Sequence, residues 1–130
     1  MQNGKHVILY IDDDQDFLDT MRVILEAHGY VMLEARTAED GLRVYQDQEP
    51  DLVIVDLMME EVDAGTSFVK DLKALGSTVP VLMLSSVGDN LSMTTDYTGL
   101  GLAGLFQKPI DPDTLITVLK MKLKKPEAAG

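Results

Sequence analysis

Acidic side chains stand directly after two short apolar stretches of the sequence. The acids are Asp12, Asp13 and Asp14 after residues 7–11, and Asp56 after residues 52–55. Carboxylate oxygens are the ligands that Mg²⁺ prefers in proteins, with water and phosphate oxygens completing its coordination. A carboxylate can also act as the nucleophile toward phosphorus and form an acyl phosphate. These acids therefore fit a Mg²⁺-dependent phosphoryl-transfer site, provided that the fold brings them together.

A serine and a lysine follow two further apolar stretches. Ser85 comes after residues 81–84, and Lys108 comes after residues 104–107. A hydroxyl and an ammonium group can orient and neutralise the oxygens of a transferred phosphoryl group. Taken singly, each of these polar residues has a simpler interpretation as a helix cap, a turn residue or a solvated surface charge. Their repeated position at the end of an apolar stretch favours one shared site.

The elements that must position these residues alternate between apolar stretches and helical patterns. Uninterrupted apolar and β-branched residues are typical of strands that are buried on both faces of a sheet. The expected strands are residues 7–11, 31–35, 52–56, 80–84 and 104–107. Apolar residues at helical spacing, with capping residues at the ends, predict helices over about residues 15–27, 38–48, 66–75 and 112–123. Residues 88–99 are rich in weak helix formers and predict only a short or mobile helix.

Five strands that alternate with five helical segments are typical of a doubly wound α/β fold, because each parallel crossover needs a helix of about this length. We therefore expect a (βα)5 three-layer sandwich around a five-stranded parallel sheet. Right-handed crossovers bring the carboxyl ends of all strands to one edge of the sheet, where ligands bind in this class of fold. The residues expected at that edge are Asp12, Asp13, Asp14, Asp56, Ser85 and Lys108.

Length and composition limit the classes of function. A chain of 130 residues, 45% of them hydrophobic, suffices for one domain with a sizeable core, and it has no cysteine for a disulfide or a thiolate metal site. The formal net charge of -11 argues against direct nucleic-acid binding, which needs clustered cations. No apolar stretch approaches the roughly 20 residues of a membrane span, and the polar start lacks a signal peptide. We expect a cytoplasmic protein that binds neither nucleic acid nor membrane.

Four motifs, in this order along the chain, resemble those of the receiver domains of two-component response regulators. The motifs are Tyr10-Ile11-Asp12-Asp13-Asp14, Val53-Ile54-Val55-Asp56-Leu57-Met58-Met59, Leu82-Met83-Leu84-Ser85-Ser86 and Phe106-Gln107-Lys108-Pro109. The resemblance implies one receiver domain over residues 5–125 between flexible termini at 1–4 and 126–130, with the flavodoxin-like strand order 2-1-3-4-5. It also implies a phosphoacceptor switch that catalyses its own phosphorylation and slow dephosphorylation, rather than a turnover enzyme.

The resemblance assigns a role to each acidic residue of the expected site. Asp56 would be the phosphoacceptor, taking a phosphoryl group from a sensor histidine kinase or a histidine phosphotransfer protein. Asp13 would bind Mg²⁺ directly, or Mn²⁺ in its place, and Asp12 would assist through water. Asp56 itself and the backbone carbonyl of Met58 would be further ligands.

Ser85 and Lys108 would complete the switch by moving onto the phosphoryl group. Their movement would bias the loops that carry them toward a second arrangement, which is a population shift. The weakly helical residues 88–99 would respond to it, and the Lys108–Pro109 peptide bond would be cis. An output domain and a homodimer are further expected partners.

The chain departs from the family pattern at several positions. Glu60 and Glu61 stand near the expected site, where the family commonly has a proline, and they would either repel the phosphodonor or widen the metal site. Leu105 stands where the family often has a tyrosine or phenylalanine that rotates with the switch, and Phe106 is expected to face the other side of the sheet. Met58 and Val87 are apolar and poorly suited to orient a water, which predicts a long-lived phosphoaspartate.

Two other interpretations stay open beside the phosphorylated switch. A haloacid-dehalogenase-type phosphatase also uses an aspartyl nucleophile, and Asp12-x-Asp14 fits its opening motif. Its late acidic pair would have to be Asp111 and Asp113, which we interpret as a helix cap. A pseudo-receiver, which is the same fold used only for docking or dimerisation, is favoured by the departures named above and disfavoured by the complete set of site residues.

Overall fold

The computed structural model of the chain describes residues 4–56, 64–85, 102–108 and 110–123. Five strands and four helices lie within these residues. In chain order they are β1 (Val7–Ile11), α1 (Gln15–Ala27), β2 (Val31–Ala35), α2 (Ala38–Gln48), β3 (Leu52–Asp56), α3 (Ala64–Ala74), β4 (Val81–Ser85), β5 (Gly104–Gln107) and α4 (Pro112–Lys122). The further helix expected within residues 88–99 lies outside the described residues.

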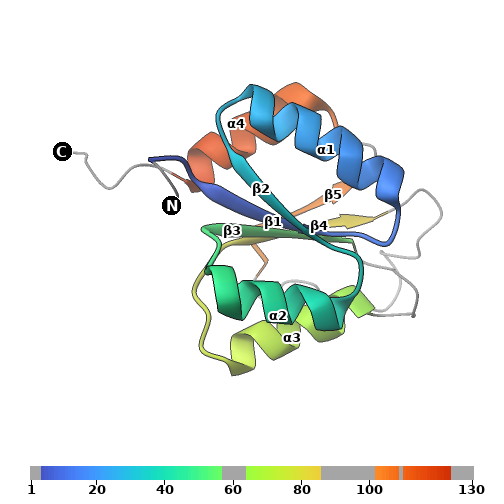
Figure 1. Ribbon diagram of the computed structural model, residues 1–130, viewed down its shortest axis with the longest axis vertical. Coiled ribbons are helices and arrows are strands. Elements are labelled where there is room, and N and C mark those ends of the chain that lie inside the picture. Colours follow the sequence, from blue (N-terminus) through green and yellow to red (C-terminus); the bar gives the residue numbers. More distant parts are fainter. Residues whose placement is uncertain (1–3, 57–63, 86–101, 109, 124–130) are drawn as a thin grey trace.

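The five strands form one parallel sheet in the order β2-β1-β3-β4-β5. Helices α1 and α4 cover one face of this sheet, and α2 and α3 cover the other, so the chain folds in three layers (Figure 1). The expected doubly wound α/β fold and its strand order 2-1-3-4-5 are thereby confirmed. Because every strand runs in the same direction, the carboxyl ends of all five lie at one edge of the sheet.

Alternate residues of each strand face opposite helical layers, because successive side chains of a strand point to opposite faces. On β1, Ile8 and Tyr10 pack in the cluster with α1 and α4, whereas Leu9 and Ile11 pack in the cluster with α3. Gly41 brings α2 close to the same strand, since a Cβ atom at this glycine would lie 2.5 Å from Ile11 Cδ1. Strand β1, which leads into the acidic residues, is therefore packed tightly on both sides.

Capping residues begin three of the helices that the structure describes, and the sequence predicted two of these caps, Thr37 and Asp111. Asp14, Thr37 and Asp111 are the N-caps of α1, α2 and α4, and their side chains accept hydrogen bonds from backbone N–H groups of the first turn. Helix α3 begins at Ala64 instead of near Thr66, so it includes a glycine whose weak helix propensity the tertiary structure overrides. Among the residues that the structure describes, no helix is both long and apolar enough to cross a membrane.

Candidate functional site

The register of the sheet places Asp12 and Asp56 side by side. Ile11 of β1 pairs with Val55 of β3, and Asp12 and Asp56 are the residues that directly follow this pair in the chain. The backbone N–H of Asp12 also donates to the carbonyl of Ala35 on β2 at 3.1 Å, which holds the end of β1 from its other side. Asp12 and Asp56 are 0% and 3% exposed. The sheet therefore fixes two buried carboxylates next to each other.

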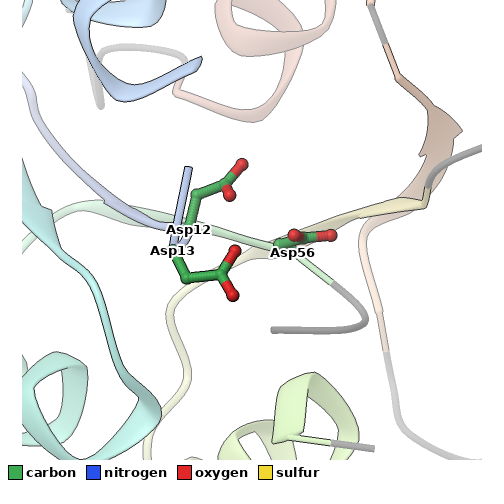
Figure 2. Close-up of side chains that lie close together, drawn as sticks. All are labelled: Asp12, Asp13 and Asp56. Atoms are coloured by element: carbon green, nitrogen blue, oxygen red, sulfur yellow. The ribbon is translucent and has the colours of Figure 1, made fainter. Parts of the chain in front are cut away.

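Asp13 adds a third carboxylate to this pair. One side-chain oxygen from each of Asp12, Asp13 and Asp56 lies within 4.8 Å of the others (Figure 2). Arg36 donates to the backbone carbonyl of Asp13 at 2.8 Å and so restrains this position. Asp14 is used differently, because its side chain accepts a backbone N–H of α1 and caps that helix. The structure thus brings together three of the four aspartates expected at this edge, and we call these three the carboxylate cluster.

Lys108 reaches the carboxylate cluster from the end of β5. Its ammonium group donates to Asp12 Oδ2 at 2.9 Å and to Asp56 Oδ2 at 3.4 Å. Burial by itself would lower the pKa of Lys108, but the hydrogen bonds and negative charges of Asp12 and Asp56 outweigh burial and raise this pKa above its ordinary value. Lys108 is therefore a firmly protonated cation that balances part of the negative charge of the cluster.

Ser85 ends β4 with its hydroxyl buried. This side chain is 1% exposed, and its Oγ makes no hydrogen bond to any residue that the structure describes. The backbone N–H of Lys108 donates to the carbonyl of Ser85 at 2.6 Å, which ties the ends of β4 and β5 together. Because a buried hydroxyl without a partner is costly, Ser85 is suited to donate to the oxygen of a ligand.

The combined set of groups fits a divalent cation and a phosphoryl group. Three carboxylates supply the hard oxygen ligands that Mg²⁺ prefers, and together they carry more negative charge than Lys108 can balance. The ammonium group of Lys108 and the hydroxyl of Ser85 supply donors of the kind that a phosphoryl group needs. The structure accordingly brings together Asp12, Asp13, Asp56 and Lys108 of the residues that the sequence predicted for this site, and it places Ser85 at the end of the neighbouring strand β4.

Two aromatic side chains contact this site, and sequence reasoning predicted neither contact. The Tyr10 hydroxyl donates to Asp12 Oδ2 at 2.5 Å, and the ammonium group of Lys108 lies 4.0 Å from the centroid of the Phe17 ring. Burial, followed by the charge of Asp12, raises the pKa of Tyr10 above its ordinary value, so its hydroxyl keeps the proton that it donates. The spacing of Tyr10 and Asp12 was a sequence signal for the first contact, because residues two apart on a strand share a face. No comparable signal linked Phe17 to Lys108.

Some predicted positions lie outside the described residues. They are Met58, Glu60, Glu61, Val87 and Pro109. Their expected roles stay predictions. Of the other departures from the family pattern, Leu105 on β5 is 37% exposed, whereas Phe106 packs in the cluster between the sheet and helices α1 and α4. The two side chains therefore face opposite sides of the sheet, as expected.

Comparison with known proteins identifies the family. The family model of the response regulator receiver domain matches residues 8–120. The chain is 30% identical over 118 residues to the transcriptional regulatory protein GlrR of Escherichia coli, which covers 91% of this chain and 26% of GlrR. It is 27% identical over 123 residues to the alkaline phosphatase synthesis transcriptional regulatory protein PhoP of Bacillus subtilis, which covers 95% of this chain and 50% of PhoP. The chain thus spans between a quarter and a half of the length of these relatives.

The fold is similar to that of solved receiver domains. The crystal structure of a response regulator receiver domain protein (CheY-like) from Methanospirillum hungatei superimposes with a TM-score of 0.81 at 25% sequence identity, covering 98% of this chain and 100% of the other. The family match and these neighbours do not favour the phosphatase interpretation. The chain belongs to the receiver domains of two-component response regulators.

Proposed function

We propose that the chain is a phosphoacceptor switch that takes a phosphoryl group onto Asp56 in a Mg²⁺-dependent reaction. The observation that carries this proposal is the carboxylate cluster at one edge of the sheet. One oxygen from each of its three carboxylates lies within 4.8 Å of the others, and Lys108 donates to two of the carboxylates. Within the cluster, Asp12 is poorly suited to be the nucleophile. Both of its oxygens accept hydrogen bonds, from the Tyr10 hydroxyl, the Lys108 ammonium and the backbone N–H of Asp14. This supports Asp56, at the end of the central strand β3, as the acceptor.

In the proposed reaction, a carboxylate oxygen of Asp56 attacks the phosphorus of a phosphohistidine on a partner protein. The new O–P bond forms as the N–P bond breaks, and the departing imidazole keeps the bonding electron pair and takes up a proton. Lys108 pairs with one phosphoryl oxygen, and the Ser85 hydroxyl donates to another. Receiver domains are not classical turnover enzymes, and in this proposal the chain catalyses only its own modification and its slow reversal.

The carboxylate cluster would hold the divalent cation. We assign Asp13 as a direct ligand, Asp12 as a ligand that acts through water, and Asp56 and the backbone carbonyl of Met58 as further ligands. When bound, Mg²⁺ or Mn²⁺ neutralises the charge of the phosphoryl oxygens during transfer. The indirect role of Asp12 is supported by the hydrogen bonds that already occupy both of its oxygens.

Phosphorylation would act as a switch because it changes the charge that Lys108 and Ser85 face. An acyl phosphate at Asp56 adds negative charge and acceptor oxygens. Lys108 now pairs with Asp12 and Asp56, and it would turn toward the new phosphoryl oxygens. Its backbone N–H donates to the Ser85 carbonyl, so the carboxyl ends of β4 and β5 would respond together. A shift in population between two arrangements of these ends is the proposed signal.

The partners follow from the family and from the length of the chain. A sensor histidine kinase or a histidine phosphotransfer protein is the proposed phosphodonor. Because the chain spans only part of its curated relatives, an output domain in the same polypeptide is a further proposed partner, and a homodimer is another. We keep the domain limits 5–125 with flexible termini, and a cytoplasmic location, as predictions of the same proposal.

The test is phosphorylation by a small donor. The chain is incubated with acetyl phosphate and Mg²⁺, and its intact mass is measured for the wild type, Asp56→Asn and Asp47→Asn. Asp47 is an exposed acid of α2 and is the matched control. We expect the mass of one phosphoryl group in the wild type and in Asp47→Asn, no gain in Asp56→Asn, and loss of the gain when Mg²⁺ is chelated. No gain in the wild type would support the pseudo-receiver, and an equal gain in Asp56→Asn would place the acceptor elsewhere.

A further inference from the structure

Tyr10 carries the one polar side-chain group of β1, a strand that is buried along its whole length. All five residues of β1 are buried, and Tyr10 is 0% exposed and among the largest fully buried side chains. Its ring belongs to the apolar cluster between the sheet and helices α1 and α4, together with residues such as Ile8, Leu18 and Ile54. A phenylalanine would supply the same apolar area, so the packing of the ring does not explain the hydroxyl. A buried phenol needs a hydrogen-bond partner, and here the partner is Asp12.

The two donors on Asp12 Oδ2 differ in charge and in freedom of movement. Lys108 is cationic and donates at 2.9 Å through a long side chain. Tyr10 is neutral and donates at 2.5 Å from a ring that is locked in the core. The other oxygen, Oδ1, accepts the backbone N–H of Asp14 at 2.9 Å. The fixed support of the Asp12 carboxylate therefore consists of one backbone amide and one phenol, whereas Lys108 is the donor that can leave.

We propose that Tyr10 is a positioning residue of the cation site, whose hydroxyl holds the Asp12 carboxylate in place both while Lys108 contacts it and after Lys108 turns away from it. The inference rests on the proposed function, in which Lys108 moves to the phosphoryl group. Without Tyr10, departure of the lysine would leave Asp12 Oδ2 with no protein donor among the contacts that the structure describes. A neutral donor suits this task, because it satisfies the buried oxygen without adding a positive charge that would compete with a divalent cation.

The same reasoning separates this role from that of a core residue. If the hydroxyl served only packing, Tyr10→Phe would leave cation binding unchanged. If it positions Asp12, removing it frees the carboxylate to rotate and weakens cation binding, although Tyr10 itself touches no cation. Groups that hold metal-binding side chains in this indirect way typically change metal affinity by about tenfold or more when they are removed.

The experiment is calorimetric titration of the full chain with Mg²⁺, in the wild type, Tyr10→Phe and Tyr30→Phe. Tyr30 packs at the edge of the same apolar cluster and is the matched control. We expect a Mg²⁺ dissociation constant about tenfold higher in Tyr10→Phe and an unchanged constant in Tyr30→Phe. Equal constants in all three proteins would overturn the role of Tyr10 while leaving the proposed function intact. Failure of the wild type to bind Mg²⁺ would instead overturn the proposed function.

A second measurement uses the wild type and does not depend on the folding of a variant. With ¹³C placed at the ζ position of tyrosine, the NMR signals of Tyr10 and Tyr30 are assigned in the wild type from their correlations with neighbouring residues and followed during the Mg²⁺ titration. We expect the Tyr10 signal to shift with the dissociation constant found by calorimetry, because its hydroxyl is bonded to Asp12, and the Tyr30 signal to stay in place. A Tyr10 signal that does not move at saturating Mg²⁺ would overturn the inference.

Discussion

The ammonium group of Lys108 lies 4.0 Å from the centre of the Phe17 ring, so helix α1 meets the end of β5 through a cation–π contact. The same ammonium group donates to Asp12 and Asp56. An aromatic face attracts a cation by about 0.5–1 kcal/mol at exposed sites and by about 2 kcal/mol where the cation is desolvated. Lys108 is 6% exposed, which places this contact toward the stronger end of that range.

Replacing both partners should reveal this contact as a coupling energy. Phe17→Leu removes the ring and Lys108→Met removes the charge, so the double variant should be more stable, by about 1 kcal/mol, than the sum of the two single losses predicts. Urea unfolding of the wild type, both single variants and the double variant measures this coupling. Phe17→Tyr keeps an aromatic face and should keep most of the coupling, whereas additive losses in the Leu cycle would show that the contact contributes nothing.

Removal of the Lys108 charge should make the fold depend on a divalent cation. In Lys108→Met, the buried carboxylates of Asp12 and Asp56 lose their cationic partner, and breaking a buried pair in this way costs about 3 kcal/mol. Added Mg²⁺ should recover most of this loss, because it supplies positive charge to the same oxygens. Urea unfolding with and without Mg²⁺ checks both effects. Unchanged stability of the metal-free variant would mean that Lys108 does not compensate the carboxylates.

Magnesium should also stabilise the wild type, because three carboxylates face one lysine. An ion that binds only the folded chain raises the free energy of unfolding by about 2.7 kcal/mol when its concentration is a hundred times the dissociation constant. Thermal unfolding in Mg²⁺, compared with K⁺ at equal ionic strength, measures this gain. Asp13→Asn should lose most of the gain, and Asp47→Asn should keep it. An equal gain in Asp13→Asn would place the ion away from the carboxylate cluster.

The sequence was sufficient to predict the sheet and the edge that carries the site. Stretches such as residues 52–55 are apolar throughout because β3 is buried on both faces, and this pattern is readable without a structure. Once parallel strands are inferred, the proximity of Asp12 and Asp56 follows from their common position at strand ends. The sequence did not distinguish the role of Asp14 from the roles of Asp12 and Asp13, because an aspartate can either cap a helix or bind a cation. Only the local geometry shows that Asp14 caps α1.

The contacts that hold the site in place were not readable from the sequence. Tyr10 shares a face of the chain with Asp12 by its spacing, yet the sequence does not show that its hydroxyl turns toward that carboxylate. Phe17 fits the helical spacing of α1, yet its contact with Lys108 depends on how α1 crosses the sheet relative to β5. Such contacts join elements that are distant in the chain, and periodicity carries information only about the element in which it occurs.

The buried phenol of Tyr10 should appear in the alkaline pH dependence of stability. Burial and the charge of Asp12 raise its pKa above the ordinary value of 10.0, so the folded chain retains a proton that the unfolded chain releases. The contribution of Tyr10 to stability is therefore complete below about pH 10 and falls by about 1.4 kcal/mol per pH unit above it, until the folded pKa is reached. The raised pKa of Lys108 changes stability with pH in the same direction. Comparison of the wild type with Tyr10→Phe therefore isolates the contribution of the tyrosine.

Urea unfolding across the alkaline range should thus show a shallower decline in Tyr10→Phe than in the wild type. Tyrosinate absorbance provides an independent check among the four tyrosines of the chain. While both proteins stay folded, their absorbance should rise equally with pH, and the wild type should gain the Tyr10 signal only at its unfolding transition. Ionisation of Tyr10 in the folded protein near its ordinary pKa would contradict this.

The phosphoaspartate should be long-lived, because Met58 and Val87, at the positions to which the family resemblance assigns an influence on hydrolysis, are apolar and offer no hydrogen bond to an attacking water. Met58→Asn adds a polar group there, and one hydrogen bond to the water, worth about 1 kcal/mol in the transition state, would speed hydrolysis several-fold to about tenfold. The chain is labelled with acetyl phosphate, the donor is removed, and loss of the phosphoryl mass is followed over time. Met121→Asn is the matched control, since Met121 is 61% exposed on α4, and its lifetime should equal that of the wild type. Rapid loss from the wild type, or equal lifetimes in all three proteins, would show that these apolar residues do not set the rate.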